Sequence, residues 1–316
     1  MTGPVETGAA RPGPSDEPVL VVEPSREAQV GEMTVRRALP RRGHRTVGAW
    51  CFADHMGPVA DGGGVGTGIG PHPHIGLQTV TWLVEGEMVH HDSLGVEQLI
   101  RPGQLNLMTA GRGVAHAEEG TEAGGGRPKH GIQLWVAQPE ATRNGEPAFE
   151  HHAELPRVAV DSGEATVLVG EFAGVTSPAR ADTDHVGVEL SLRRGSTVVP
   201  LHPGHEHALV VLEGEVDLGE EAVGPGALAY LGSGRDELGI AMGDDARVIL
   251  LGGTPFESEI LMWWNFVARS RDEIEDARAA WQDHDEDRFP RVSALTEWIA
   301  APPHELRSAP PASPMP

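Results

Sequence analysis

The sequence has almost no cysteine and no long apolar run. Cys51 is the single cysteine in 316 residues, so the chain cannot form an internal disulfide, which favours a reducing compartment. No stretch of 18 or more residues is continuously apolar, and we therefore expect no membrane span. The first 18 residues are polar and proline-rich and lack the apolar centre of a signal peptide. These absences predict a cytoplasmic protein that has no membrane partner.

Basic residues are also scarce. Lys and Arg total 24 against 47 Asp and Glu, which gives a formal net charge of −23. Such a chain would repel a phosphate backbone on average, so we expect no direct nucleic-acid partner. One small basic group is expected to be a solvated strand edge or loop. It comprises Arg36, Arg37, Arg41, Arg42 and Arg45.

Glycine and proline, in contrast, are abundant. The 41 Gly and 26 Pro residues are too many for a helical protein and fit short strands joined by turns. A chain of 316 residues can also bury two ordinary cores. Composition and length together fit a chain of many short strands that can form two cores.

Two short motifs carry the strongest functional signal. His72 and His74 are separated by one proline, and His116 and Glu118 are separated by one alanine. A β-strand directs residues i and i+2 to the same face, so each pair can point into one cavity. Three imidazoles and one carboxylate suit a divalent first-row metal. Six-coordinate geometry would leave two positions for substrate or dioxygen.

The motifs around the first histidine pair recur later in the chain, which indicates a duplicated unit. The first copy contains His72-Pro-His74, Glu85-Gly-Glu87 and Pro102-Gly103, and the second contains His205-Glu-His207, Glu213-Gly-Glu215 and Pro225-Gly226. In the second copy Gly239 and Ala241 take the places of His116 and Glu118. We therefore expect no complete metal site in the second half.

This pattern resembles the cupin pattern, and its two copies resemble a bicupin. The segments PHPHIGLQTVTWLVEGE, HHDSLG, PGQLNLMTAGRGVAHAEE and LLGGTPFESEILMWWNFVARSRDEIEDA are similar to those of pirins in particular. The resemblance implies two tandem cupin-type β-barrels (double-stranded β-helices) with a C-terminal helix and one mononuclear metal in the N-terminal barrel. Matched position by position, the family's metal ligands fall on His72, His74, His116 and Glu118.

The expected domain organisation follows from the motifs and the composition. Residues 1–29 read as a flexible lead, 30–138 as the N-terminal barrel with the metal site, 139–157 as a linker, 158–290 as the C-terminal barrel plus helix, and 291–316 as a proline-rich tail. Ser270 to Glu273 form a capping box, which predicts a helix start. Ile274, Ala277 and Trp281 would form the apolar face of that helix.

Several pirins act as quercetin 2,3-dioxygenases, which open the flavonol ring and release carbon monoxide. The resemblance therefore implies a dioxygenase whose partners are O2 and a small aromatic or enol substrate. Its cofactor would be one divalent transition metal, Fe(II) before Ni, Co, Cu or Mn. Glu118 would be the catalytic residue, because it could accept the substrate's hydroxyl proton. The alternative is a metal-dependent, redox-sensitive regulator that binds a partner protein without turnover. We expect a monomer in either case.

One stretch departs from the family pattern. Pirins usually carry an HRGFET-like stretch where this chain has His74-Ile-Gly-Leu-Gln-Thr79, so the family's glutamate is Gln78 here. In an unbroken strand Gln78 would face the same interior as His74. Gln78 and Asn106 are candidate acceptors for the histidine nitrogens that do not bind metal. His90 and His91 are candidate outer residues of the site.

Overall fold

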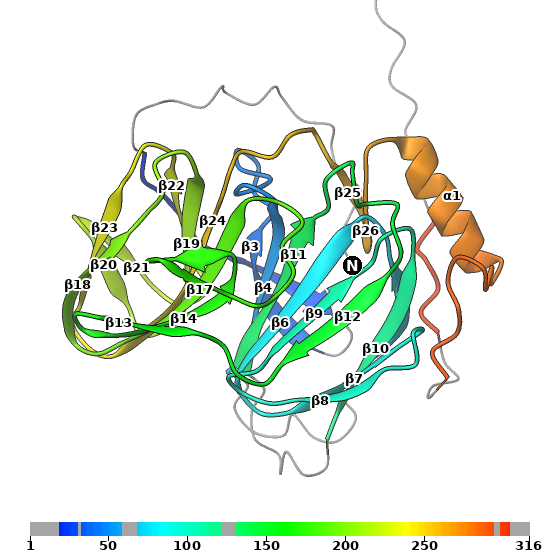
Figure 1. Cartoon of the computed structure of the whole chain (residues 1–316), viewed down its shortest axis with the longest axis horizontal. Helices are drawn as coiled ribbons and strands as arrows, with labels where there is room; N and C mark the ends of the chain where they lie inside the picture. Colours follow the sequence, from blue (N-terminus) through cyan, green and yellow to red (C-terminus); the bar gives the residue numbers. More distant parts are fainter. Residues whose placement is uncertain (1–18, 31–32, 59–67, 122–129, 294–297, 304–316) are drawn as a thin grey trace, which may run out of the picture.

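The structure, a computed structural model, describes residues 19–30, 33–58, 68–121, 130–293 and 298–303. Two β-barrels lie side by side, and one α-helix covers the outer edge of the first barrel (Figure 1). The all-β prediction, the two cupin-type barrels and the C-terminal helix are confirmed. No helix in the described part of the chain has the length and apolar character that crossing a bilayer requires.

The first barrel consists of a seven-stranded sheet and a four-stranded sheet. The larger sheet has the order β12-β9-β6-β11-β4-β3-β2, with strands Ala148–His152, Leu105–Thr109, Leu77–Glu85, His130–Ala137, Trp50–Met56, Met33–Leu39 and Arg26–Val30. The smaller sheet has the order β5-β10-β7-β8, with strands Ile69–His74, Val114–Gly120, Met88–Asp92 and Glu97–Ile100.

The second barrel repeats this arrangement strand for strand, which is the structural form of the sequence repeat. Its larger sheet has the order β1-β22-β19-β24-β17-β14-β13, with strands Val21–Glu23, Leu228–Gly232, Glu206–Glu213, Ala246–Gly253, His185–Leu192, Gly163–Val169 and Arg157–Val160. Its smaller sheet has the order β18-β23-β20-β21, with strands Gly195–Pro200, Glu237–Met242, Val216–Leu218 and Glu221–Val223. Two hairpins complete the fold: β15 (Glu171–Phe172) with β16 (Val175–Thr176), and β25 (Leu261–Trp263) with β26 (Phe266–Ala268).

The structure departs from two of the expected boundaries. The expected flexible lead, residues 1–29, contains β1 and all but the last residue of β2, and β1 pairs with β22 of the second barrel. The expected linker 139–157 contains β12, which pairs with β9 of the first barrel. Each added strand satisfies the N–H and C=O groups of a sheet edge, which sequence periodicity does not reveal. Residues 1–18 of the lead and 304–316 of the tail lie outside the described residues.

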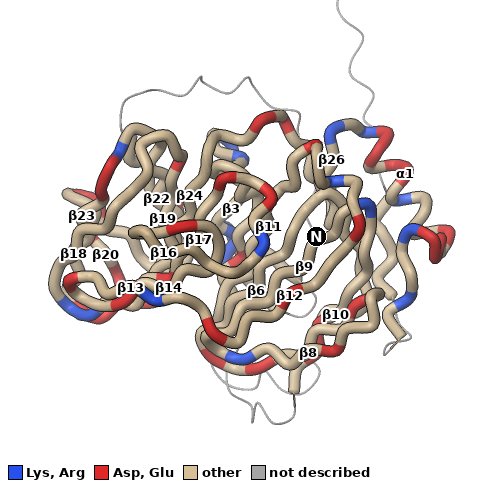
Figure 2. Tube along the Cα trace, viewed as in Figure 1, with Lys and Arg blue, Asp and Glu red and all other residues tan. Residues whose placement is uncertain are grey.

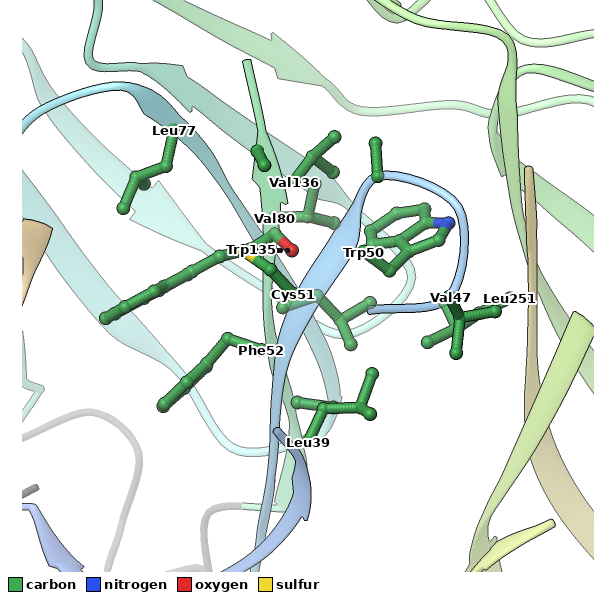
Figure 3. Packing of buried hydrophobic residues seen from close by; sticks show 14 of the residues in the cluster. Leu39, Val47, Trp50, Cys51, Phe52, Leu77, Val80, Trp135, Val136 and Leu251 are labelled. Carbon is green, nitrogen blue, oxygen red and sulfur yellow. Dashed lines mark hydrogen bonds between the residues drawn. The ribbon is translucent and has the colours of Figure 1, made fainter. Parts of the chain in front are cut away.

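The two large sheets pack against each other through one apolar cluster that draws residues from both barrels. Trp50 belongs to this cluster, and its Nε1 donates to the backbone oxygens of Val186 and Gly252 at 3.1 Å each. Figure 3 shows the Trp50 ring on one side of β4 and the rings of Phe52 and Trp135 on the other. The first sheet therefore has one face against the second barrel and another face inside its own barrel.

The predicted helix is α1, Arg271–Gln282. The Ser270 side chain accepts a hydrogen bond from Glu273 N, and Ile274, Ala277 and Trp281 are buried, as the sequence predicts. Glu273 itself accepts from Arg269 N, one residue before the expected position. The helix packs with β25, β26 and Ala115 and Ala117 of β10, so the C-terminal segment returns to the first barrel.

The charged residues are spread over many elements. Figure 2 shows Asp and Glu interspersed with Lys and Arg along both barrels and on α1. One of the arginines expected in a solvated edge or loop is buried instead. Arg37 donates to both carboxylate oxygens of Asp54, at 2.8 and 2.6 Å, because the register of β3 and β4 places the two residues side by side.

Candidate metal centre

Three of the four expected ligands meet in the first barrel. His72 and His74 lie at the end of β5, and His116 lies opposite His72 on the neighbouring strand β10. One ring nitrogen of each histidine falls within 4.8 Å of the other two. The Nε2 atoms of His74 and His116 are 3.0 Å apart. All three side chains are buried.

The second ring nitrogens of His72 and His74 have backbone acceptors. His72 Nδ1 donates to Gly70 O at 2.8 Å, and His74 Nδ1 donates to Asn265 O at 2.9 Å. A carbonyl accepts only from a protonated nitrogen, so in the neutral form of each ring Nε2 carries the lone pair. Asn265 lies in the turn between β25 and β26, which means that the C-terminal segment orients a residue of the N-terminal site.

His116 is held through a second histidine. Its Nδ1 lies 3.3 Å from His90 Nδ1, and His90 Nε2 lies 3.2 Å from Asp92 Oδ2. The carboxylate accepts from His90 Nε2, which leaves His90 Nδ1 to accept from His116 Nδ1. The relay therefore also leaves a lone pair on His116 Nε2. His91 points elsewhere, and its Nε2 lies 3.1 Å from Glu119 Oε2.

The environment keeps the three imidazoles neutral. Burial is the main cause that lowers the pKa of His72 to about 4, and it lowers the pKa of His74 and His116 well below the usual value. The neighbouring histidines add to the shift by charge repulsion. Neutral imidazoles are the form that binds metal, so these three side chains are in the metal-binding form near pH 7.

The donor set fits a divalent transition metal. Three neutral imidazole nitrogens with their lone pairs directed at one small volume are the donors that Fe, Co, Ni, Cu and Zn prefer. Two Nε2 lone pairs at 3.0 Å repel each other unless a cation or proton lies between them. This fit rests on His72, His74 and His116.

The fourth expected ligand lies nearby but outside this group. Glu118 is buried on β10, opposite His90 of β7, and the β5–β10 pairing is irregular between His116 and Glu118. Its carboxylate oxygens are not among the described ligand atoms that lie within 4.8 Å of one another. The role of Glu118 as ligand and as base therefore remains a prediction.

Two sequence-based assignments are corrected. Gln78 Nε2 donates to Thr109 Oγ1, and Asn106 Oδ1 accepts from His151, so neither supplies the acceptor for a candidate ligand. The parity argument for Gln78 fails because the chain turns at Gly76, with φ +67°, between β5 and β6. The sequence does not predict that the backbone oxygens of Gly70 and Asn265 are the acceptors, because every residue type carries a backbone carbonyl.

The second histidine motif is also not a structural copy of the first. His205 comes directly before β19 and His207 is its second residue, and β19 corresponds to β6, whereas His72 and His74 lie at the end of β5. Counted from the glutamates of the shared turn, His72 is 13 residues before Glu85 and His205 is eight before Glu213. Among the described residues no second group of three or more metal-ligating side chains has its ligand atoms within 4.8 Å of one another.

Aromatic rings border the centre on the side of the large sheet. The Trp135 ring of β11 meets His74 edge to face, with centroids 5.2 Å apart. Phe149 of β12 stacks on His90 at 4.6 Å, and Phe52 stacks on Trp135 at 4.1 Å. An apolar, planar ligand can be held against such rings. The sequence alone did not identify these aromatic residues as neighbours of the site, because they come from three separate strands.

Comparisons with known proteins agree with this architecture. The family model described as Pirin matches residues 32–136, and the model described as Pirin C-terminal cupin domain matches residues 187–289. A Pseudomonas aeruginosa protein provisionally named as a quercetin 2,3-dioxygenase is 47% identical over 282 residues, which cover 88% of this chain and 89% of the relative.

Two further matches extend over most of the chain. A pirin-like protein of Caulobacter vibrioides is 37% identical, with 82% of this chain and 91% of the relative covered. The crystal structure of quercetin 2,3-dioxygenase from Acinetobacter baumannii is 43% identical, has a TM-score of 0.87, and covers 92% of this chain and 97% of that one. From these matches and the paired barrels we conclude that the chain belongs to the pirin family.

Proposed function

We propose that the protein is a metal-dependent dioxygenase of flavonol-type substrates, similar to quercetin 2,3-dioxygenases. The single observation that carries the proposal is the convergence of three neutral, buried histidines beside an aromatic wall. Relatives that are 47% and 43% identical carry the quercetin 2,3-dioxygenase name, which supports the same reaction class.

In this proposal His72, His74, His116 and Glu118 hold one divalent metal, with Fe(II) as the first candidate. When bound, the metal supplies Lewis-acid and redox chemistry toward an enol and dioxygen. Glu118 accepts the proton of the substrate's enol hydroxyl, which leaves an enolate. Trp135 orients the aromatic rings of the substrate next to His74.

The first test concerns the ligands. We expect His74→Ala to abolish stoichiometric metal binding, whereas His207→Ala in the second barrel leaves it unchanged. Metal content is measured on purified protein after reconstitution with Fe, Ni, Co, Cu or Mn. If His74→Ala binds as much metal as the wild type, the assignment of His74 as a ligand is wrong. Glu118→Gln is the matched variant for the carboxylate, and it reveals whether Glu118 contributes to affinity.

The second test concerns turnover. Protein reconstituted with each metal is given quercetin under air, and oxygen uptake and carbon monoxide are followed together. We expect equal amounts of both, and a 10²- to 10⁴-fold lower kcat in Glu118→Gln if this side chain moves the proton. If no oxygen is consumed above the metal-free protein, the dioxygenase proposal fails, and the partner-binding alternative becomes the better account.

A further inference from the structure

A row of six polar side chains crosses the large sheet of the first barrel. The strand register places one residue from each of β3, β4, β11, β6, β9 and β12 in direct succession: Arg37, Asp54, Gln133, Thr81, Asn106 and His151. Directly opposed residues of neighbouring strands lie on the same face of a sheet. We call these six residues the polar row.

The polar row faces the inside of the first barrel. The adjacent row, two residues along each strand, contains Phe52, Trp135 and Phe149. The Trp135 ring meets His74 of the small sheet, the Phe149 ring meets His90, and Phe52 stacks on Trp135. On the other side of the polar row the interior is closed by apolar residues from both sheets: Val35, Met56, Leu83, Met88 and Ile100. The polar row is therefore enclosed between the aromatic wall of the candidate metal centre and an apolar floor.

The second barrel shows that the fold itself does not require a polar row. Its corresponding strands β14, β17, β24, β19 and β22 carry the registered row Val167, Val188, Leu250, Leu209 and Ala229. All five are buried in one apolar cluster. Burying a charged pair or a polar atom without a partner costs free energy. The polar row contains both, in Arg37 with Asp54 and in Asn106 Nδ2, so the first barrel keeps it at a cost in stability.

The polar row also retains an unused donor. Three contacts pair most of the hydrogen-bonding groups in the row. These are Arg37 with Asp54, Thr81 Oγ1 to Gln133 Oε1 at 2.9 Å, and His151 Nδ1 to Asn106 Oδ1 at 2.5 Å. Asn106 Nδ2, on a side chain that is 2% exposed, finds no acceptor among the described residues. A buried donor without an acceptor costs about 1–3 kcal/mol, which a bound acceptor would recover.

The position of the polar row matches an elongated substrate. Adjacent rows on one face of a strand are about 7 Å apart, because each residue advances the chain by about 3.4 Å. A planar ligand that reaches the histidines with one group and lies along Trp135 would present its far substituents to the polar row. Gln133 and His151 are only partly buried, so solvent reaches both the middle and one end of the row.

We propose that the polar row binds the oxygen substituents of the substrate that lie away from the metal, so that the site selects polyhydroxylated over unsubstituted aromatic enols. Asn106 Nδ2 donates to a substrate oxygen, and the Thr81 hydroxyl is the second contact. This inference rests on the proposed function. It adds the residues that distinguish one flavonol from another.

The test compares two ligands in the metal-loaded, full-length protein. Quercetin carries ring hydroxyls, whereas 3-hydroxyflavone has the same chelating enol without them. Dissociation constants are measured without oxygen, by quenching of tryptophan fluorescence, for the wild type, Thr81→Val and Asn106→Leu. Thr197→Val is the matched control, because Thr197 is a buried threonine of β18 in the second barrel.

We expect the wild type to bind quercetin more tightly than 3-hydroxyflavone. Thr81→Val and Asn106→Leu should each weaken quercetin binding about 5- to 10-fold, as the loss of one buried hydrogen bond does, and change 3-hydroxyflavone binding less than about twofold. Thr197→Val should change neither. If Asn106→Leu does not fold, Thr81→Val decides, since it keeps the shape of the side chain.

The outcomes separate the inference from the function on which it rests. Equal weakening for both ligands, or an unchanged preference, would show that the polar row is only structural, while the dioxygenase proposal stands. Failure of the metal-loaded wild type to bind either ligand would overturn both.

Discussion

His90 is the residue that joins the candidate metal centre to the rest of the small sheet. It lies between His116 and Asp92, with nitrogen contacts at 3.3 and 3.2 Å, and it stacks on Phe149. Asp92 in turn accepts the backbone N–H groups of Leu94 and Val96 through Oδ1. The ring orientation of His116 is thus fixed by a chain of contacts that ends in a hydrogen-bonded turn.

We predict that His90→Phe weakens metal binding about 10- to 100-fold, the usual effect of losing a partner of a metal-binding histidine. The phenylalanine ring can still stack on Phe149 but cannot accept from His116 Nδ1. His91→Phe is the matched control, because His91 contacts Glu119 rather than a candidate ligand. Affinities are compared by competition with a chelator. Equal affinities in the two variants would show that the relay does not position His116.

The residues of the centre were predictable where their chemistry is local. The alternation of side chains along a strand is enough to pair His72 with His74, and the repeat with its glycine turns points to His116. The orientation of Glu118 depends on an irregular pairing, and the polar row depends on the register of six strands. Long-range register of this kind leaves no mark in a single sequence.

At the scale of elements, the turn between β5 and β6 sets the position of His74. Gly76 has φ +67°, and a Cβ at this position would lie 2.2 Å from Val267 O. The close approach lets β26 hydrogen-bond to the turn, with Val267 N donating to Ile75 O at 3.1 Å. A glycine is needed here for both its backbone conformation and its lack of a side chain.

We predict that Gly76→Ala lowers the free energy of unfolding by about 3 kcal/mol or more and weakens metal binding, because β26 must move away from the turn that holds His74. Gly95→Ala is the control: φ is +86°, but a Cβ there meets nothing within 4 Å. It should cost about 1–2 kcal/mol for the backbone alone and leave metal binding unchanged. Urea unfolding and metal content measure both effects, and equal costs would contradict the steric argument.

The elements themselves were predicted to different degrees. The helix was predictable because Ser270 and Glu273 form a local cap and its apolar face repeats at helical spacing. The structural position of the histidine motif in the second barrel was not predictable, because the β18–β19 connection is longer than the two residues between β5 and β6. Motif similarity there reflects the same residue types at different structural positions.

On the scale of the whole molecule, the two barrels are tied together by segments that cross between them. The β25–β26 turn of the C-terminal half supplies Asn265 O to His74, and β1 of the N-terminal segment completes the large sheet of the second barrel. Trp50 adds hydrogen bonds from the first barrel to the backbone of the second. Domain boundaries drawn from composition alone separate segments that the structure joins.

The N-terminal segment therefore stabilises the barrel that lies farther along the sequence. β1 pairs Val21, Val22 and Glu23 with Tyr230, Ala229 and Leu228, and Val22 packs on the apolar core of the second barrel. Removing β1 exposes the edge of β22 and part of this core.

We predict that deletion of residues 1–24 lowers the melting temperature by several degrees, as a loss of about 1–2 kcal/mol does. Deletion of residues 1–18 is the control, since it leaves β1 in place. Hydrogen exchange should locate the loss in β22 and β19, whereas β5 and β10, which carry the histidines, keep their protection; faster exchange in β5 and β10 alone would contradict this role of β1.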